Sequence, residues 1–220
     1  MTKRIAILGS GEWASQLADF IKVDPSMELV GFVDNKPVRG GVFCSDNELV
    51  TLYNRGAFDC LFIGIGYARF DLRKKLYEEF SQKQIPFATI IHPTAVVSPS
   101  AKIGEGSFIG PCSLINKDAV IGQNVVVNSS VLLAHNTIVG NHSYIAGRAA
   151  IAGYSRIGEC SFIGLNSTIK DHIAIADYTT VGCAANVVKN IEESNHIYIG
   201  NPAKQFKYRI DCDADKTLRL

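Results

Sequence analysis

The sequence contains no long apolar run and almost no net charge. Its 220 residues include 22 Lys and Arg against 21 Asp and Glu, a formal charge of +1, and the basic residues form no cluster. This balance argues against nucleic acid or an acidic macromolecule as a partner. No apolar stretch is as long as a membrane span, and the one near the start is too short and too interrupted for a signal peptide. We therefore expect a cytoplasmic protein that does not insert into a membrane.

The cysteines are scattered and include no C-x-x-C pair. There are six: Cys44, Cys60, Cys112, Cys160, Cys183 and Cys212. This pattern is typical of reduced thiols in a cytosolic protein and does not provide the ligand spacing of a structural zinc site. His135, His142 and His172 also lack metal-ligand spacing, so we expect no metal.

Residues 1–90 alternate between strand-like and helix-like segments. Short apolar runs predict strands over 4–9, 27–34, 58–66 and 86–91, and helical spacing of apolar residues predicts helices over 12–23 and 69–83. Strands that alternate with helices indicate a small parallel sheet with helices on its faces, which is a Rossmann-like arrangement.

The turn after the first predicted strand reads "GSGEWA", that is Gly9-x-Gly11-x-x-Ala14. Such a turn places backbone N–H groups and a helix N-terminus where a phosphate can bind. Asp34 ends the second predicted strand, roughly where dinucleotide folds carry a ribose-binding acid. The alternative is that the glycines only permit a tight turn and close helix packing.

From residue 97 the pattern changes to a strict period of six. An aliphatic residue occupies sixteen consecutive positions six residues apart: Val97, Ile103, Ile109, Ile115, Ile121, Val127, Leu133, Val139, Ile145, Ile151, Ile157, Ile163, Ile169, Ile175, Val181 and Val187. A small residue usually stands two positions earlier, and Gly often follows the aliphatic one. A period this regular predicts a repeat solenoid.

Six residues suit one short strand plus one turn. Three such strands per coil make a triangular prism with a coil repeat of about eighteen residues, in which each inward side chain stacks on its equivalent in the next coil. We expect about five coils from the sixteen hexads. The small residues are expected to fit the corners, and the glycines to supply the turn geometry.

The hexapeptide repeat resembles that of the left-handed β-helix acyltransferases. The order of a Rossmann-like segment, "IIHPTAVVSPSAKIGEGSFIG", the repeats and "IGNPAKQFK" is similar to that of the nucleotide-sugar N-acetyltransferases and the sialic-acid O-acetyltransferases. The resemblance implies a nucleotide-sugar-binding domain over 1–90, a left-handed β-helix acyltransferase domain over 91–207, and a C-terminal tail over 208–220. It also implies acetyl-CoA as acyl donor and a homotrimer.

The same resemblance assigns the general base to His135, within "NSSVLLAHNTIVG", and places Asn128 at the substrate. Asn136 stands where the family has an acidic residue that orients the base. The residues themselves give modest independent support, because a histidine at a turn can exchange protons near neutral pH. The alternative is an ordinary turn histidine on a polar corner.

A coil repeat of about eighteen residues would align His135 with Lys117, Gly153 and Asp171. We expect a bare glycine beside the histidine to leave room for a thioester and to offer its N–H to the carbonyl oxygen. The resemblance likewise places Gly153 at the acetyl-CoA.

The remaining site residues come from the resemblance. Tyr144, Cys183 and Lys204 are expected at the coenzyme, with Tyr144 standing where the family often has a second histidine. The nucleotide part of the sugar is expected at Gly9, Ser10, Gly11 and Asp34. The Glu12–Ala14 segment departs from the family pattern, and this departure leaves open an acceptor other than the usual nucleotide-linked amino sugar.

Three functions follow from these observations. The first is an N-acetyltransferase that acts on a nucleotide-linked amino sugar in surface glycan synthesis. The second is an O-acetyltransferase that acts on a sialic-acid-like hydroxyl, which the Glu12–Ala14 departure keeps open. The third is a non-catalytic trimeric nucleotide-binding scaffold, which the missing acid beside His135 mildly favours.

Overall fold

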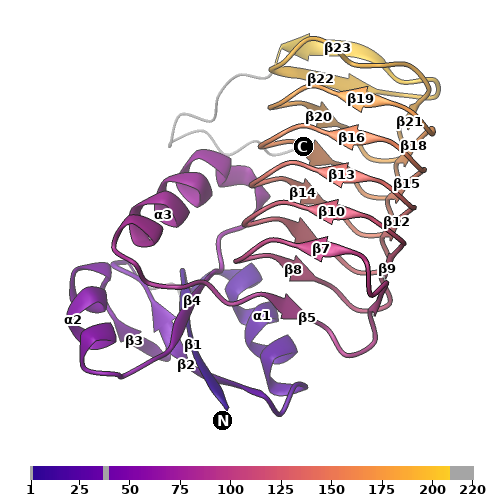
Figure 1. Ribbon diagram of the computed structural model, residues 1–220. Coiled ribbons are helices and arrows are strands. Elements are labelled where there is room, and N and C mark those ends of the chain that lie inside the picture. Colours follow the sequence, from indigo (N-terminus) through magenta and orange to yellow (C-terminus); the bar gives the residue numbers. More distant parts are fainter. Residues whose placement is uncertain (1, 37–39, 209–220) are drawn as a thin grey trace. The chain divides into compact units, whose positions relative to one another are not determined.

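The computed structural model describes residues 2–36 and 40–208. The chain divides into two compact units, residues 1–93 and 94–220 (Figure 1), where the sequence suggested a boundary after residue 90. The tail expected over 208–220 lies outside the described residues, apart from the backbone of Tyr208. No helix in the described parts of the chain is long and apolar enough to cross a membrane.

The first unit is built on a parallel sheet in the order β3-β2-β1-β4. Its strands are β1 (Lys3–Leu8), β2 (Met27–Val33), β3 (Val42–Cys44) and β4 (Cys60–Ile63). Its helices are α1 (Glu12–Lys22), α2 (Leu49–Asn54) and α3 (Phe70–Gln82), with short 3-10 turns over Asp46–Glu48 and Tyr67–Arg69. The chain runs from β1 through β2 to β3 on one side and then returns to β4 on the other side of β1.

The predicted elements of this unit are largely present, with two differences. Residues 35–57 carry no clear period, and β3 and α2 were not predicted there. The predicted strand over 86–91 is shortened to β5 (Ile90–Ile91), while Phe87 forms only a single bridge to Leu61. Pro86 has no N–H to donate, which limits the pairing of this segment with β4.

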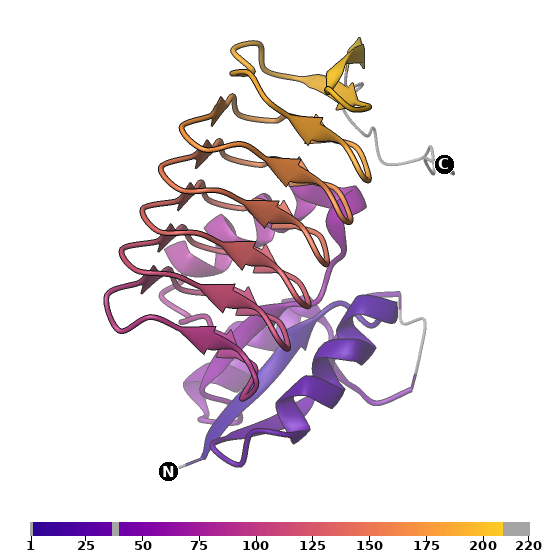
Figure 2. The same ribbon diagram turned by 90° about the vertical axis from the view of Figure 1, so that its right-hand side faces the viewer.

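The second unit is a parallel β-helix with three sides, and the coils are seen one above another in Figure 2. Its first side contains β7 (Lys102–Ile103), β10 (Val120–Ile121), β13 (Ile138–Val139), β16 (Arg156–Ile157) and β19 (Ala174–Ile175). Its second side contains β8 (Phe108–Ile109), β11 (Val126–Val127), β14 (Tyr144–Ile145), β17 (Phe162–Ile163), β20 (Thr180–Val181), β22 (His196–Ile199) and the antiparallel β23 (Lys204–Tyr208). Its third side contains β6 (Val96–Val97), β9 (Leu114–Ile115), β12 (Leu132–Leu133), β15 (Ala150–Ile151), β18 (Thr168–Ile169) and β21 (Asn186–Val187).

The period of six therefore corresponds to one two-residue strand per hexad. Strand partners are eighteen positions apart, as in Val126 with Tyr144 and Leu132 with Ala150. Sixteen hexad strands, β6 to β21, give a little more than five coils among the described residues, and the predicted β-helix is confirmed.

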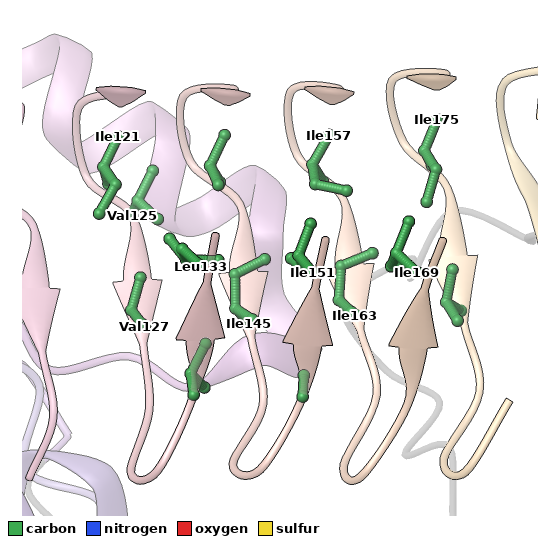
Figure 3. Close-up of a cluster of buried hydrophobic side chains, with 14 of the residues drawn as sticks. Ile121, Val125, Val127, Leu133, Ile145, Ile151, Ile157, Ile163, Ile169 and Ile175 are labelled. Carbon is green, nitrogen blue, oxygen red and sulfur yellow. The ribbon is translucent and has the colours of Figure 1, made fainter. Parts of the chain in front are cut away.

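The inward side chains form one continuous apolar core along the prism (Figure 3). Leu133, Ile151 and Ile163 are completely buried, and each is the second residue of its strand. Burial of a side chain of this size contributes about 1.5–3 kcal/mol, so the repeating column is the main source of stability in this unit.

The corners close in a way that the sequence did not show. The glycines after the aliphatic residues were expected to supply turn geometry, but Gly104, Gly140 and Gly164 do not have positive φ. A Cβ on any of them would lie 2.5–2.6 Å from backbone atoms of the next coil. These glycines are needed because the backbone of the next coil occupies the space of a side chain.

The left-handed backbone conformation falls instead two positions later in each turn. It recurs every six residues at Cys112, Asp118, Asn124, Ser130, Asn136, His142, Arg148, Tyr154, Cys160, Asn166, His172, Tyr178 and Ala184, with φ between +50° and +61°. Among these residue types only Asn, Asp and His are commonly found in this region.

Candidate functional site

The candidate catalytic residue lies at one corner of the prism, which we call the histidine corner. It consists of the turns 116–119, 134–137, 152–155 and 170–173, which follow β9, β12, β15 and β18. The register stacks these turns on one another, because Tyr154 N donates to His135 O (3.1 Å) and His172 N donates to Gly153 O (3.0 Å). The column of Lys117, His135, Gly153 and Asp171 inferred from the period is thus present in the structure.

His135 is exposed and directed by its own turn. Its Nδ1 lies 3.2 Å from Oδ1 of Asn136, whose backbone is left-handed with φ +59°. An amide oxygen accepts a hydrogen bond, so this pairing suits the tautomer in which Nδ1–H donates and Nε2 carries the lone pair. The amide orients the imidazole as an acid would, but it adds no negative charge.

The imidazole occupies the space that we expected to be open beside Gly153. A Cβ at Gly153 would lie 2.7 Å from Cε1, 2.9 Å from Nε2 and 3.2 Å from Nδ1 of His135. The expectation that this space would receive the thioester is therefore wrong in that detail, because the ring itself lies against the glycine. Gly153 is required at this position for the imidazole to take up this orientation.

Two further rings continue the histidine corner, and the sequence did not reveal their contacts. The ring of Tyr154 lies edge to face with His135, with centroids 5.1 Å apart, and is stacked on His172 at 4.9 Å. His172 Nδ1 lies 2.8 Å from Oδ2 of Asp171, and this hydrogen bond holds the pKa of Asp171 below its usual value. The sequence feature that could have indicated these contacts is the spacing of eighteen between residues 136, 154 and 172.

The residues expected at the coenzyme lie on other parts of the prism. Tyr144 is on β14 and is buried, and its hydroxyl accepts a hydrogen bond from Nδ2 of Asn128 (3.1 Å). Cys183 is exposed at the turn after β20, and Lys204 is exposed on β23. Asn128 Oδ1 accepts from the N–H of Ser129 (2.7 Å). No contact described here joins any of these residues to His135.

In the first unit, the predicted nucleotide-binding residues gather at the carboxyl ends of β1 and β2. Asp34 Oδ2 accepts hydrogen bonds from the N–H (2.9 Å) and the hydroxyl (2.6 Å) of Ser10, and its Oδ1 accepts from Lys36 N (2.9 Å). Asp34 therefore fixes the glycine turn against the end of β2. A ribose hydroxyl would have to use the lone pairs that these bonds leave.

The two glycines of the turn differ in their surroundings. Gly9 has φ +100°, which favours glycine, whereas a Cβ at Gly11 would meet nothing within 4 Å. Gly11 is also the N-cap of α1, where backbone N–H groups favour an anion. β1 and β4 enclose the topological switch point of the sheet, where α/β folds bind ligands. Gly66, at the end of β4, also has open space around it and was not predicted.

Among residues 2–36 and 40–208, no group of three or more His, Cys, Asp or Glu side chains is arranged to hold a metal ion.

Comparisons with known proteins agree with this architecture. The family profile of the GMPPB C-terminal domain matches residues 91–199. No curated protein matches the chain. Among solved structures, PerB from Caulobacter crescentus in complex with CoA and GDP-perosamine is 28% identical, with a TM-score of 0.86 over 94% of this chain and 99% of that one. A histidine-to-asparagine mutant of this perosamine N-acetyltransferase has also been solved in the same complex.

Two more solved structures have the same fold. The acetyltransferase domain of PglB from Neisseria gonorrhoeae in complex with acetyl coenzyme A is 25% identical, with a TM-score of 0.80 over 94% of this chain and all of that one. WeeI from Acinetobacter baumannii is 21% identical, with a TM-score of 0.80 over 93% of this chain and all of that one.

The fold of the chain is that of the perosamine N-acetyltransferase and of the PglB acetyltransferase domain. The likeness to PerB, at 28% identity, extends through both units of the chain.

The contact between Gly153 and the imidazole leads to a first prediction. A Gly153→Ala variant should fold normally, since the backbone φ is not in the left-handed region, but the added methyl group should displace the His135 ring. The crystal structure of the variant, or the imidazole NMR resonances of His135, would show the displacement. Gly11→Ala is the control, because its methyl group meets open space. An unmoved ring in Gly153→Ala would contradict the described packing.

Proposed function

We propose that this chain is an acetyl-CoA-dependent N-acetyltransferase that acts on the amino group of a nucleotide-linked amino sugar. The carrying observation is the match to the GDP-perosamine N-acetyltransferase over 94% of this chain, which includes the sheet that would bind the nucleotide and the prism with the histidine corner. We place the reaction in the cytoplasm, in the synthesis of a surface glycan.

In this proposal His135 is the general base. Nε2 of the neutral imidazole removes a proton as the amine nitrogen attacks the thioester carbonyl carbon. The negative charge that develops on the carbonyl oxygen needs a donor, and the Gly153 N–H has no acceptor among the described residues. The tetrahedral species then expels the CoA thiolate, which receives the proton held by the imidazole, and the products are the amide and free CoA.

The two substrates would be held by different parts of the chain. Gly9, Ser10, Gly11 and Asp34 suit the nucleotide, because the turn combines backbone donors with open space at Gly11. We assign Tyr144, Gly153, Cys183 and Lys204 to the coenzyme and Asn128 to the acceptor, as the family resemblance implies. The exposed ammonium of Lys204 suits a phosphate of the coenzyme.

We further propose that the chain assembles as a homotrimer through the third side of the prism. The outward residues Val96, Leu114 and Leu132 are aligned in register on this side and remain 62%, 38% and 37% exposed. Adjacent exposed apolar side chains of this kind mark an interaction surface. The histidine corner bounds the same side, so a neighbouring subunit packed there would lie next to His135.

The function is tested by acetyl transfer to a panel of nucleotide-linked amino sugars, followed through release of the free CoA thiol. His135→Ala should reduce turnover by a factor of about 10² or more, the usual contribution of a general base. His196→Ala, on β22, is the matched control and should turn over at the wild-type rate. Equal turnover in His135→Ala and wild type would contradict the assignment of the base.

The same assay distinguishes the other two functions. Turnover on sialic-acid-like hydroxyls but on no amine would replace the proposal with O-acetylation. Coenzyme binding without turnover on any acceptor would favour a scaffold.

A second prediction concerns the neutral amide beside the base. Asn136→Asp places a carboxylate next to His135 at a left-handed position that Asp tolerates. A negative charge favours the protonated imidazole, so the acidic limb of the profile of kcat/KM against pH should move to higher pH, by a few tenths of a unit up to about 1. Asn166→Asp adds the same charge at φ +58° on another corner and should leave the profile in place. A shift to lower pH would contradict the orientation of the pair.

A third prediction tests the assembly. Wild type should sediment at three times the 23.9 kDa mass of one chain, and Leu132→Glu should dissociate it, because a buried unpaired carboxylate is costly. Val120→Glu is the matched control, since Val120 is also 37% exposed but faces outward on the first side. Dissociation by Val120→Glu alone would move the interface to that side.

A further inference from the structure

The histidine corner carries one ring in each of three successive coils. The rings of His135 and Tyr154 have centroids 5.1 Å apart and planes at 82°, and those of Tyr154 and His172 are 4.9 Å apart and inclined by 23°. Backbone hydrogen bonds between the coils fix this order, since Tyr154 N donates to His135 O and His172 N to Gly153 O.

The far end of this ring stack is anchored. Nδ1 of His172 lies 2.8 Å from Oδ2 of Asp171, and the bond lowers the pKa of Asp171, so the carboxylate is charged at neutral pH. A hydrogen bond to a charged acceptor is shorter and stronger than a neutral one. The pair is exposed, 67% at His172 and 52% at Asp171, so the bond favours this orientation of the His172 ring but does not fix it alone.

At the other end of the stack, the imidazole of His135 lies beside Gly153 and meets the ring of Tyr154. Cε1 of His135 lies 2.7 Å from the position that a Cβ of Gly153 would take, and the ring also meets that of Tyr154. The remaining restraint is the 3.2 Å bond to Asn136, which is long and neutral. Ring packing thus supplies orientation that the amide provides only weakly.

The left-handed corner position does not favour the tyrosine of the stack. Tyr154 and His172 both adopt φ +59°, a conformation in which His is more often found than Tyr and which is unfavourable for a bulky L-residue. Tyr154 remains 51% exposed, so its ring recovers little of this cost by burial. Asn136 holds the same position one coil earlier with a residue that suits it.

We propose that Tyr154 is a positioning residue for His135, held in place by His172 and Asp171, and that this ring stack takes the place of the acid missing at residue 136. The inference rests on the proposed function of His135 as the base. Tyr154 touches no reacting atom in this scheme. It restricts the rotation of the imidazole so that Nε2 points steadily toward the acceptor amine, and orientation of a reacting group strongly affects rate.

The test compares Tyr154→Asn with Tyr154→Phe. Tyr154→Asn removes the ring and inserts a residue suited to the left-handed backbone, so the thermal midpoint should be unchanged or higher. Its kcat should fall about tenfold or more, with both KM values within about twofold of wild type. Tyr154→Phe keeps the ring and should retain kcat within about twofold. Tyr178→Asn, at φ +55° on another corner, is the control for the backbone change and should leave kcat unchanged.

A second readout does not depend on activity. The ring protons of His135 should lose their ring-current shift in Tyr154→Asn and keep it in Tyr154→Phe, as measured by NMR on the full chain. Tyr154→Asn with wild-type kcat and unshifted His135 resonances would overturn the proposal, as would a loss of kcat that only follows a loss of folded protein. If wild type acetylates no acceptor, the proposed function fails, and the NMR comparison alone decides whether Tyr154 holds the imidazole.

Discussion

Backbone hydrogen bonds between successive coils are the constraint on which the rest of the prism depends. They pair each strand with the strand eighteen residues further on, as in Val126 with Tyr144. Once this register is set, a side chain at any turn has a determined neighbour one coil away. The number of residues per coil therefore determines that His135 lies beside Gly153 and Asn136 beside Tyr154, whatever side chains stand at these positions. The apolar column along the axis makes this register stable, because a shift of one residue would turn every aliphatic side chain outward.

The unfavourable backbone conformations of the repeat lie at the corners of the prism, and so does the candidate base His135. The turns from Gly106 to Ala184 each contain a left-handed residue, and residues such as Arg148 and Tyr178 occupy that position although it suits Asn or Asp better. The buried aliphatic residue of each hexad offsets the cost, since its burial contributes about 1.5–3 kcal/mol. The core therefore tolerates unfavourable residues at the corners, and corner positions are free to vary with function.

Much of the second unit could be predicted from the sequence, because the aliphatic residues recur with the same period as the strands of the backbone. The strands, the prism and the column through His135 follow from counting in sixes and eighteens. The arrangement of the side chains could not be predicted, since the spacing of residues gives no information about their rotamers. It did not reveal that the imidazole of His135 fills the space beside Gly153, or that Tyr154 stacks on His172. In the first unit, residues 35–57 have no strong period, and β3 and α2 were missed for that reason.

The surroundings of Gly153 differ from those of the glycines that close the other two corners. At the other two corners Gly140 and Gly164 directly follow the aliphatic residue and lie against the backbone of the next coil. At the histidine corner that position is held by Ala134 and Ala152, so the coils leave room there for a Cβ. Its glycine comes one position later, at Gly153, and what lies against it is a side chain of the preceding coil. Loss of Gly140 or Gly164 would disturb the stacking of coils, whereas Gly153 governs only the setting of one imidazole. Gly147 holds the equivalent position at another corner, where the side chain of Leu165 lies against it, so what sets Gly153 apart is that its neighbour is the imidazole of the candidate base.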